Sequence, residues 1–130
     1  MLWQNSGVSM IFDIETDGFD ATKIHCLSFT EGDLVVSTTD YSEMKAALCA
    51  AGKIIGHNII RYDLPVLERL IGFKPRRDQQ VIDTLALSWY VNYERPRHGL
   101  EGYGVEYGVP KPQIDDWASL SVEEYIHRCE

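Results

Sequence analysis

Apolar runs separated by short polar breaks predict an ordered series of strands and helices. Strand-like runs come first, at residues 8–12, 24–30 and 34–37, with a polar loop over residues 15–23 between the first two. Only Glu31-Gly32-Asp33 separates the second run from the third, so these two strands must be antiparallel. The chain therefore opens with a predicted β-meander.

Helical spacing appears in the middle of the chain. Residues 40–43 (DYSE) have the D-x-x-E form of a capping box, and apolar residues at helical spacing follow until Gly52, where we expect the helix to stop. Residues 53–56 read as a short strand. A second helical stretch follows, with Pro65 suited to its first turn and Gly72 at its end.

The same alternation continues after a polar loop. Residues 81–82 form a very short apolar run, and Asp83 or Thr84 then caps a third helix that reaches about residue 90. Further helices are expected at residues 100–107 and from a second capping box at 121–124 to the last residue. Strands separated by helices pair in parallel through right-handed crossovers. The predicted fold is α/β, a mixed five-stranded sheet flanked by helices, with an antiparallel meander, then two parallel strands, and the first strand near the centre. That is the layout of the ribonuclease H-like fold.

Composition is typical of one ordinary globular domain. The chain has 130 residues, of which 45% are hydrophobic and 25% charged. It contains no apolar run long enough to span a membrane and no secretory signal at its start, so we expect no membrane association. The cysteines (Cys26, Cys49 and Cys129) are odd in number and lack metal-like spacing, which favours reduced thiols in a cytoplasmic compartment.

A net charge of −8 argues against a protein that grips nucleic acid mainly through bulk electrostatics. It does not exclude a metal-dependent nuclease, whose bound ions supply local positive charge. Basic residues gather in two predicted loops, at Lys74, Arg76 and Arg77 and again at Arg95, Arg97 and His98. Each group is interpreted first as a solvated loop.

Candidate chemistry begins at the end of the first strand. Because strand side chains alternate, Asp13 and Glu15 lie on one face of it. Two close carboxylates repel each other unless something positive lies between them, and oxygen ligands suit Mg²⁺ or Mn²⁺. The alternative is a turn that is merely acidic, since Asp and Gly are common turn residues.

A second acidic segment, residues 58–63, lies where a predicted parallel strand passes into a helix. Ligand sites in open α/β sheets collect beyond the carboxyl ends of the strands, so Asp63 is expected near Asp13 and Glu15. The alternative for Asp63 is a carboxylate that stabilises a helix N-terminus.

Together these segments resemble the DEDD family of 3′–5′ exonucleases, most closely the proofreading domains of family A DNA polymerases, including those of phages. Residues 13–16 match the family's D-x-E-T motif, and residues 58–63, preceded by His57, match N-x-x-x-[YF]-D. Ile82-Asp83-Thr84 and His98-Gly99-Leu100 match two later family segments. The resemblance runs in order from about residue 8 to residue 107.

The resemblance implies roles for individual residues. Asp13, Glu15 and Asp63 are implied as catalytic carboxylates that bind two divalent ions, Mg²⁺ or Mn²⁺. Thr16 and Phe19 occupy positions that hold the terminal nucleotide, and Asn58 and Tyr62 are expected to line a single-strand cleft. Asp83 is interpreted as a helix cap rather than a ligand, and His98 has no assigned role.

The family's third motif, Y-x-x-x-D or H-x-x-x-x-D, is incomplete. Tyr125 is a candidate for its tyrosine, but Cys129 stands where the aspartate belongs. His127 is the other candidate, and its aspartate would fall beyond Glu130. Residues 1–130 are therefore interpreted as one exonuclease-like domain, either cut within its third motif or naturally short with a damaged site. Glu130, in the neighbouring turn, is a further candidate for the missing carboxylate.

The expected activity is two-metal hydrolysis of phosphodiester bonds at single-stranded DNA 3′ ends. RNA is not excluded as a substrate, since discrimination at the 2′-hydroxyl depends on local geometry. A polymerase domain or replication protein is an expected partner, in the cytoplasm of a bacterium or phage-infected cell. The competing hypothesis is an inactive module of the same fold that binds a protein or nucleic acid.

Overall fold

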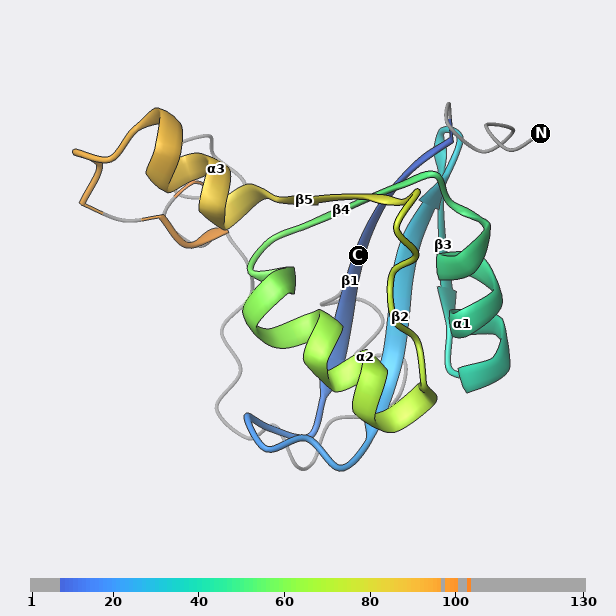
Figure 1. Ribbon diagram of the computed structural model, residues 1–130. Helices are drawn as coiled ribbons and strands as arrows, with labels where there is room; N and C mark the ends of the chain where they lie inside the picture. The colour runs from blue at the N-terminus through green and yellow to red at the C-terminus, as the bar shows by residue number, and fades with distance from the viewer. Residues whose placement is uncertain (1–7, 97, 101–102, 104–130) are drawn as a thin grey trace.

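A computed structural model of the chain describes residues 8–96, 98–100 and 103. It contains one mixed sheet of five strands in the order β3-β2-β1-β4-β5 (Figure 1). The strands are β1 (Ser9–Thr16), β2 (Ile24–Glu31), β3 (Leu34–Thr38), β4 (Lys53–Gly56) and β5 (Gln80–Asp83). The predicted sheet, with its meander and two parallel strands, is confirmed.

Strand β1 is central and pairs differently on its two sides. It is antiparallel to β2 from Phe12↔Phe29 to Thr16↔Ile24, and parallel to β4 from Ser9↔Lys53 to Ile11↔Ile55. Strand β4 ends at Gly56, whereas β1 continues past this point. The last residues of β1 therefore have a β-strand neighbour on the β2 side only.

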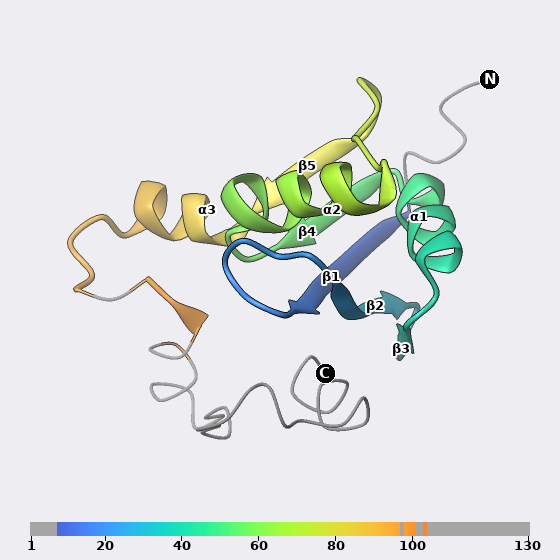
Figure 2. The same cartoon turned by 90° about the horizontal axis from the view of Figure 1, so that it is seen from below.

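Helices α1 (Tyr41–Ala50) and α2 (Leu64–Ile71) cover one face of the sheet (Figure 2). The alternation along β1 turns Met10, Phe12 and Ile14 toward these helices. The core that they share also includes Ile24, Leu27, Met44, Leu48, Ile54, Ile59, Val66, Leu67 and Phe73, each of which is almost fully buried. No helix in the described part of the chain is long and apolar enough to cross a membrane.

The first strand is longer than the hydrophobic pattern predicts. We expected an apolar strand over residues 8–12 and a loop from residue 15, but β1 runs to Thr16 and the loop begins at Asp17. Pairing with β2 continues through the acidic residues, with Asp13 opposite Ser28 and Glu15 opposite Cys26. Cross-strand hydrogen bonds, which hydrophobicity does not report, extend the strand.

Asp40 caps the start of α1 as predicted, but Glu43 does not bond directly to the Asp40 N–H as in a standard capping box. Asp40 accepts hydrogen bonds from the N–H groups of Ser42 and Glu43 (2.8 and 3.4 Å). The Glu43 carboxylate accepts from the Thr38 hydroxyl, and the Asp40 N–H donates to that hydroxyl, so Thr38 lies between the two halves of the box. The helix ends at Ala50 with Ala51 extended, one residue before the predicted stop at Gly52.

A π-helical turn, η2 (Ile59–Asp63), lies between β4 and α2 and was not predicted. It follows Asn58, whose backbone is left-handed at φ 60°. The expected features of α2 are present: Pro65 lies in its first turn, and Gly72 closes it in a left-handed conformation.

Helix α3 (Thr84–Val91) follows β5 directly and extends beyond the end of the sheet (Figure 1). Asp83 is its N-cap, since the carboxylate accepts from the N–H groups of Leu85 and Ala86. The helix expected at 100–107 is described only at Leu100 and Tyr103, both helical, and the one expected from 121 lies outside the described residues.

Candidate functional site

Asp13 and Glu15 lie on the same face of β1, as the alternation of strand side chains predicts. Ile11 belongs to this face too and is half exposed, whereas Phe12 and Ile14 point into the core on the other face. Both carboxylate side chains are partly exposed. The central strand thus presents two carboxylates on the face opposite α1 and α2.

Asp63 reaches this end of β1 from the last residue of η2. Its side chain is 4% exposed, and its carboxylate accepts a hydrogen bond from the N–H of Ile14. Ile14 lies beyond the part of β1 that pairs with β4. The Asp63 carboxylate therefore accepts the N–H that would otherwise bond to a neighbouring strand. The other oxygen, Oδ2, is buried and has no hydrogen-bond partner in the described part of the chain.

The Asp63 carboxylate is close to a second negative charge. Burial raises the pKa of its carboxyl to about 8, and the Asp13 carboxylate adds to the rise. Although Asp63 precedes α2, its side chain makes no capping hydrogen bond there. The Asp63 carboxylate therefore does not cap α2 by a hydrogen bond, and it accepts from the N–H of Ile14 instead.

Thr16, Tyr62 and Gly18 are joined by hydrogen bonds. The Tyr62 hydroxyl donates to the carbonyl oxygen of Gly18 (2.7 Å) and contacts the Thr16 hydroxyl. Partial burial raises the pKa of Tyr62, which keeps this phenol protonated. Two residues expected at the substrate site thus meet, and they tie η2 to the loop after β1.

The loop over residues 17–23 is ordered by the carboxylate of Asp17. It accepts from the N–H groups of Thr22 and Lys23 (2.9 and 3.2 Å) and from the Thr22 hydroxyl, and these bonds lower its pKa to about 2. Gly18 has φ 153°, a conformation that favours glycine. Phe19 follows with 96% of its surface exposed, so an apolar ring projects from the fixed loop after β1.

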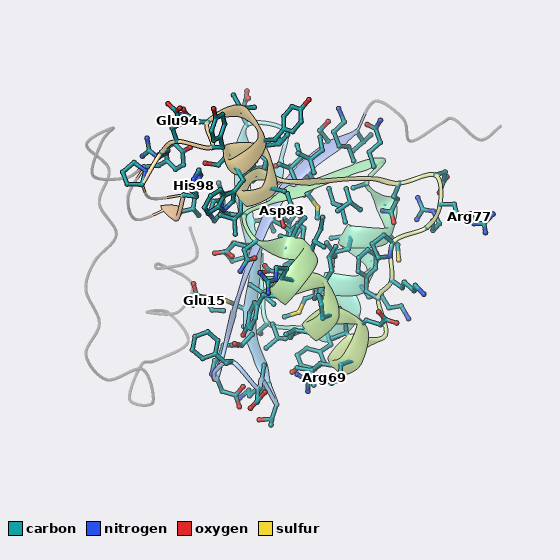
Figure 3. The ribbon with its side chains drawn as sticks, turned by 60° about the vertical axis from the view of Figure 1, so that its left-hand side comes forward. Glu15, Arg69, Arg77, Asp83, Glu94 and His98 are labelled. Carbon is teal, nitrogen blue, oxygen red and sulfur yellow. The ribbon has the colours of Figure 1, made fainter. Side chains whose placement is uncertain are left out.

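Asp83 does more than cap α3, and sequence reasoning missed the second half of its role. Besides the two α3 amides, it accepts from the N–H groups of Asn58 (2.8 Å) and Ile60 (3.0 Å). Burial acts to raise the pKa of this carboxyl, but the four backbone hydrogen bonds outweigh it and lower the pKa. Figure 3 shows Asp83 at the base of α3. Asn58, expected in a substrate cleft, is half buried here.

His98 belongs to a small cluster beside α3 (Figure 3). Its Nδ1 hydrogen-bonds with the Ser88 hydroxyl (2.6 Å), which also bonds the Tyr103 hydroxyl (2.5 Å). Its ring stacks on Trp89 at 3.8 Å, and the Arg95 guanidinium lies 3.7 Å above the Tyr103 ring. The H-x-L segment therefore anchors the chain to α3. This gives His98 a structural role that the sequence did not reveal.

The basic loop before β5 lies on the side of the molecule opposite Glu15 (Figure 3). Arg76 donates to the backbone carbonyl of Cys49 (2.6 Å) and pairs with Asp78 (3.0 Å), so it holds the loop against the end of α1. Lys74 and Arg77 are exposed. Arg76 is exposed as well, so the solvated-loop interpretation fits all three residues, although Arg76 also ties the loop to α1.

The carboxylates fit a hard divalent ion by their chemistry. Among the described residues no group of three His, Cys, Asp or Glu side chains is arranged to hold a metal. Mg²⁺, however, is commonly bound by one or two carboxylates, with waters and substrate phosphates completing its shell. The buried, unbonded Oδ2 of Asp63, near the Asp13 carboxylate, is the kind of donor that such an ion uses.

The third-motif candidates, Tyr125 and His127, lie outside the described residues, as do Cys129 and Glu130. Arg97 is also outside them. Among the described cysteines, Cys26 and Cys49 form no disulfide bond with each other.

No protein-family model and no curated protein match the chain. Solved structures do. *Brucella melitensis* NrnC bound to pGG is 24% identical with a TM-score of 0.70, covering 98% of this chain and 68% of that one. The same protein with bound Mg²⁺ is 23% identical with a TM-score of 0.68, covering 98% and 69%. *Escherichia coli* RNase D, an exoribonuclease involved in structured RNA processing, is 20% identical with a TM-score of 0.61, covering 93% and 35%. The shared architecture is the ribonuclease H-like fold.

Proposed function

We propose that this protein is a metal-dependent 3′–5′ exonuclease that trims single-stranded nucleic acid, with DNA as its first substrate. The observation that carries the proposal is the buried carboxylate of Asp63. One of its oxygens is without a hydrogen-bond partner in the described chain, and the Asp13 carboxylate lies close enough to raise its pKa. A buried carboxyl oxygen without a donor, close to a second carboxylate, suits a divalent cation that replaces the proton favoured by burial.

Asp13, Glu15 and Asp63 are the residues that would hold two divalent ions, Mg²⁺ or Mn²⁺. When bound, such ions neutralise the scissile phosphate, lower the pKa of an attacking water and stabilise the leaving 3′-oxygen. The chain's own contribution is placement. Strand β1 supplies two carboxylates on one face, and η2 brings the third to the N–H of Ile14.

The substrate side of the proposal depends on the loop after β1. The hydrogen bonds of Tyr62, Thr16 and Asp17 fix this loop, and Phe19 projects from it with its ring free to stack. Stacking on an aromatic ring is tolerant of base identity, which suits an enzyme that trims any 3′ end. Asn58 and Tyr62 would line the strand's path.

RNA is the second candidate substrate. The resemblance of the motifs to polymerase proofreading domains favours DNA, together with a polymerase or replication protein as partner. RNase D is an exoribonuclease, and NrnC has been solved with pGG bound; these likenesses favour RNA or a short oligonucleotide. Tyr125 or His127 would orient the attacking water in either case.

The test is digestion of 5′-labelled single-stranded DNA and RNA of one sequence, with Mn²⁺ or Mg²⁺. We expect a ladder of shortened products that disappears in Asp13→Ala and Asp63→Ala. Glu68→Ala, which removes an exposed carboxylate from α2, is the matched control and should leave the ladder unchanged.

Absence of a ladder on both substrates from folded, metal-supplemented protein would contradict the enzyme proposal. It would favour the alternative of an inactive module, which is supported by the acidic net charge and by Cys129 in the place of an aspartate. Nucleic acid binding without cleavage, measured by fluorescence anisotropy, would then identify that module's partner class.

A further inference from the structure

Two consecutive residues at the start of α3 hold the turn that delivers Asp63. Asp83 accepts from the N–H groups of Asn58 and Ile60, at 2.8 and 3.0 Å. Thr84 bonds through its hydroxyl to Nδ1 of His57 (2.8 Å) and donates to the carbonyl of Gly56 (3.3 Å). Two side chains at the junction of β5 and α3 thus bond to the segment that leads from the end of β4 into η2.

This arrangement is unusual as helix capping. The first N–H groups of a helix lack intrahelical partners and are normally satisfied by a side chain of the residue just before the helix. Asn58 occupies that position before η2, but its side chain makes no capping hydrogen bond. The acceptor comes instead from 23 and 25 residues further along the chain. One carboxylate therefore caps two helical starts and fixes them relative to each other.

The turn has little room to settle elsewhere. A Cβ atom on Gly56 would lie 2.3 Å from Cγ2 of Ile59 and 3.0 Å from the carbonyl oxygen of Phe12. Ile59 is completely buried, and Asn58 is held in a left-handed conformation. A small displacement of Asn58 or Ile60 would be carried through one turn of η2 to Asp63.

We infer that Asp83 is a positioning residue: its bonds to Asn58 and Ile60 set where the Asp63 carboxylate stands against Asp13, although Asp83 itself holds neither metal nor substrate. Both oxygens of Asp83 are occupied by backbone donors, Oδ1 by Asn58, Leu85 and Ala86 and Oδ2 by Ile60. The inference rests on the proposed function for its catalytic consequence. Its structural part stands independently.

Variants at Asp83 can separate the two roles. Asp83→Ser keeps an N-cap for α3, since serine is a good cap, but its short side chain cannot also reach Asn58 and Ile60. Asp83→Asn keeps one acceptor oxygen and turns an amide N–H₂ toward Ile60 or toward the other donors. Asp40→Ser, at the N-cap of α1, is the matched control because it makes the same exchange on a helix away from η2.

Amide hydrogen exchange gives the first readout, with no need for activity. In Asp83→Ser we expect residues 58–63 to exchange at least tenfold faster while residues 86–91 of α3 stay close to wild type. Asp83→Asn should show a smaller acceleration centred on Ile60. Asp40→Ser should leave residues 58–63 unchanged.

Metal affinity and rate give the second readout. Substitution of groups that orient metal ligands costs about ten- to a hundredfold in affinity or activity. We expect Asp83→Ser to raise the Mn²⁺ midpoint and lower kcat by that factor with KM for the oligonucleotide nearly constant, whereas Asp40→Ser changes neither. Wild-type exchange at 58–63 in both Asp83 variants would overturn the inference. If residues 58–63 exchange faster in the Asp83 variants but the wild-type protein shows no nuclease activity, the positioning role of Asp83 is upheld and the proposed function is rejected.

Discussion

At the scale of single residues, the site is built around an electrostatic conflict. Asp63 is buried, and Asp13 lies close enough to disfavour its ionised form. One oxygen has a backbone donor, from Ile14, and the other has none in the described chain. A carboxylate in this situation holds a proton at neutral pH unless a cation replaces it. The protein therefore stores unfavourable energy in the metal-free state.

This conflict predicts how stability depends on pH. The pKa of Asp63 is about 8 in the folded protein and near 3.8 in the unfolded chain, so the folded state binds the extra proton between these values. The contribution of Asp63 to stability is thus full below pH 3.8 and is lost as pH rises to about 8. Asp63→Asn, which mimics the protonated form, should make metal-free protein more stable at pH 8.5, by up to roughly 5 kcal/mol.

Urea unfolding of metal-free protein at pH 5 and pH 8.5 measures this effect. Wild type should lose stability between the two, and Asp63→Asn should lose much less. Glu68→Gln, an exposed carboxamide exchange on α2, controls for the general effect of removing a charge. Equal losses in wild type and Asp63→Asn would show that Asp63 is ionised throughout.

Much of the residue-level site could be predicted, for a simple reason. A period of two places Asp13 and Glu15 on one face whatever the exact strand ends, and Asp63 follows a strand that must be parallel. The second role of Asp83 could not be predicted, because its partners are backbone amides 23 and 25 residues away. Such bonds carry no sequence signal.

At the scale of elements, the turn η2 is the feature on which the site depends. π-Helical turns are rare in proteins, and those that occur often lie at functional sites. This one ends in Asp63. It packs tightly on β4, since the space beside Gly56 is filled by the side chain of Ile59 and the backbone of Phe12.

Gly56→Ala should therefore disturb the turn. The added methyl group would meet Ile59 at 2.3 Å, and Phe12's backbone oxygen cannot move away without bending β1. We expect a loss of about 2–3 kcal/mol in the free energy of unfolding and weaker metal binding. Gly99→Ala, where a Cβ meets no atom of the described residues within 4 Å, is the matched control and should change stability little. Wild-type stability in Gly56→Ala would mean that η2 shifts freely.

The elements show where pattern reasoning stops. Strand β4 was predicted with its observed bounds because an apolar run is enclosed by polar residues and glycine. Strand β1 was predicted too short because Asp13 and Glu15 interrupt its hydrophobicity while its ladder with β2 continues. The π-turn was missed because a helical period of 3.6 does not distinguish it from the start of α2.

At the scale of the whole molecule, the charge distribution bears on how the proposed site would meet a substrate. The chain carries a net charge of −8, and its basic loop around Arg77 lies opposite Glu15 (Figure 3). A polyanionic substrate at the proposed site would meet repulsion from the carboxylates of Asp13, Glu15 and Asp63. Cation binding would remove that repulsion and the conflict at Asp63 together.

This coupling predicts that Mg²⁺ stabilises the full chain more strongly as pH rises. Metal must displace the proton on Asp63, so apparent affinity should increase up to about tenfold per pH unit below the pKa of about 8. Since a ligand that binds the folded state stabilises it by mass action, the rise in Tm with 10 mM Mg²⁺ should be several degrees at about pH 8.5 and much smaller at about pH 6.5. Asp63→Asn should show little rise at either pH, whereas Glu68→Gln should behave as wild type. A rise that is the same at both pH values would place the ion away from Asp63, and no rise at either would favour the module that binds without cleaving.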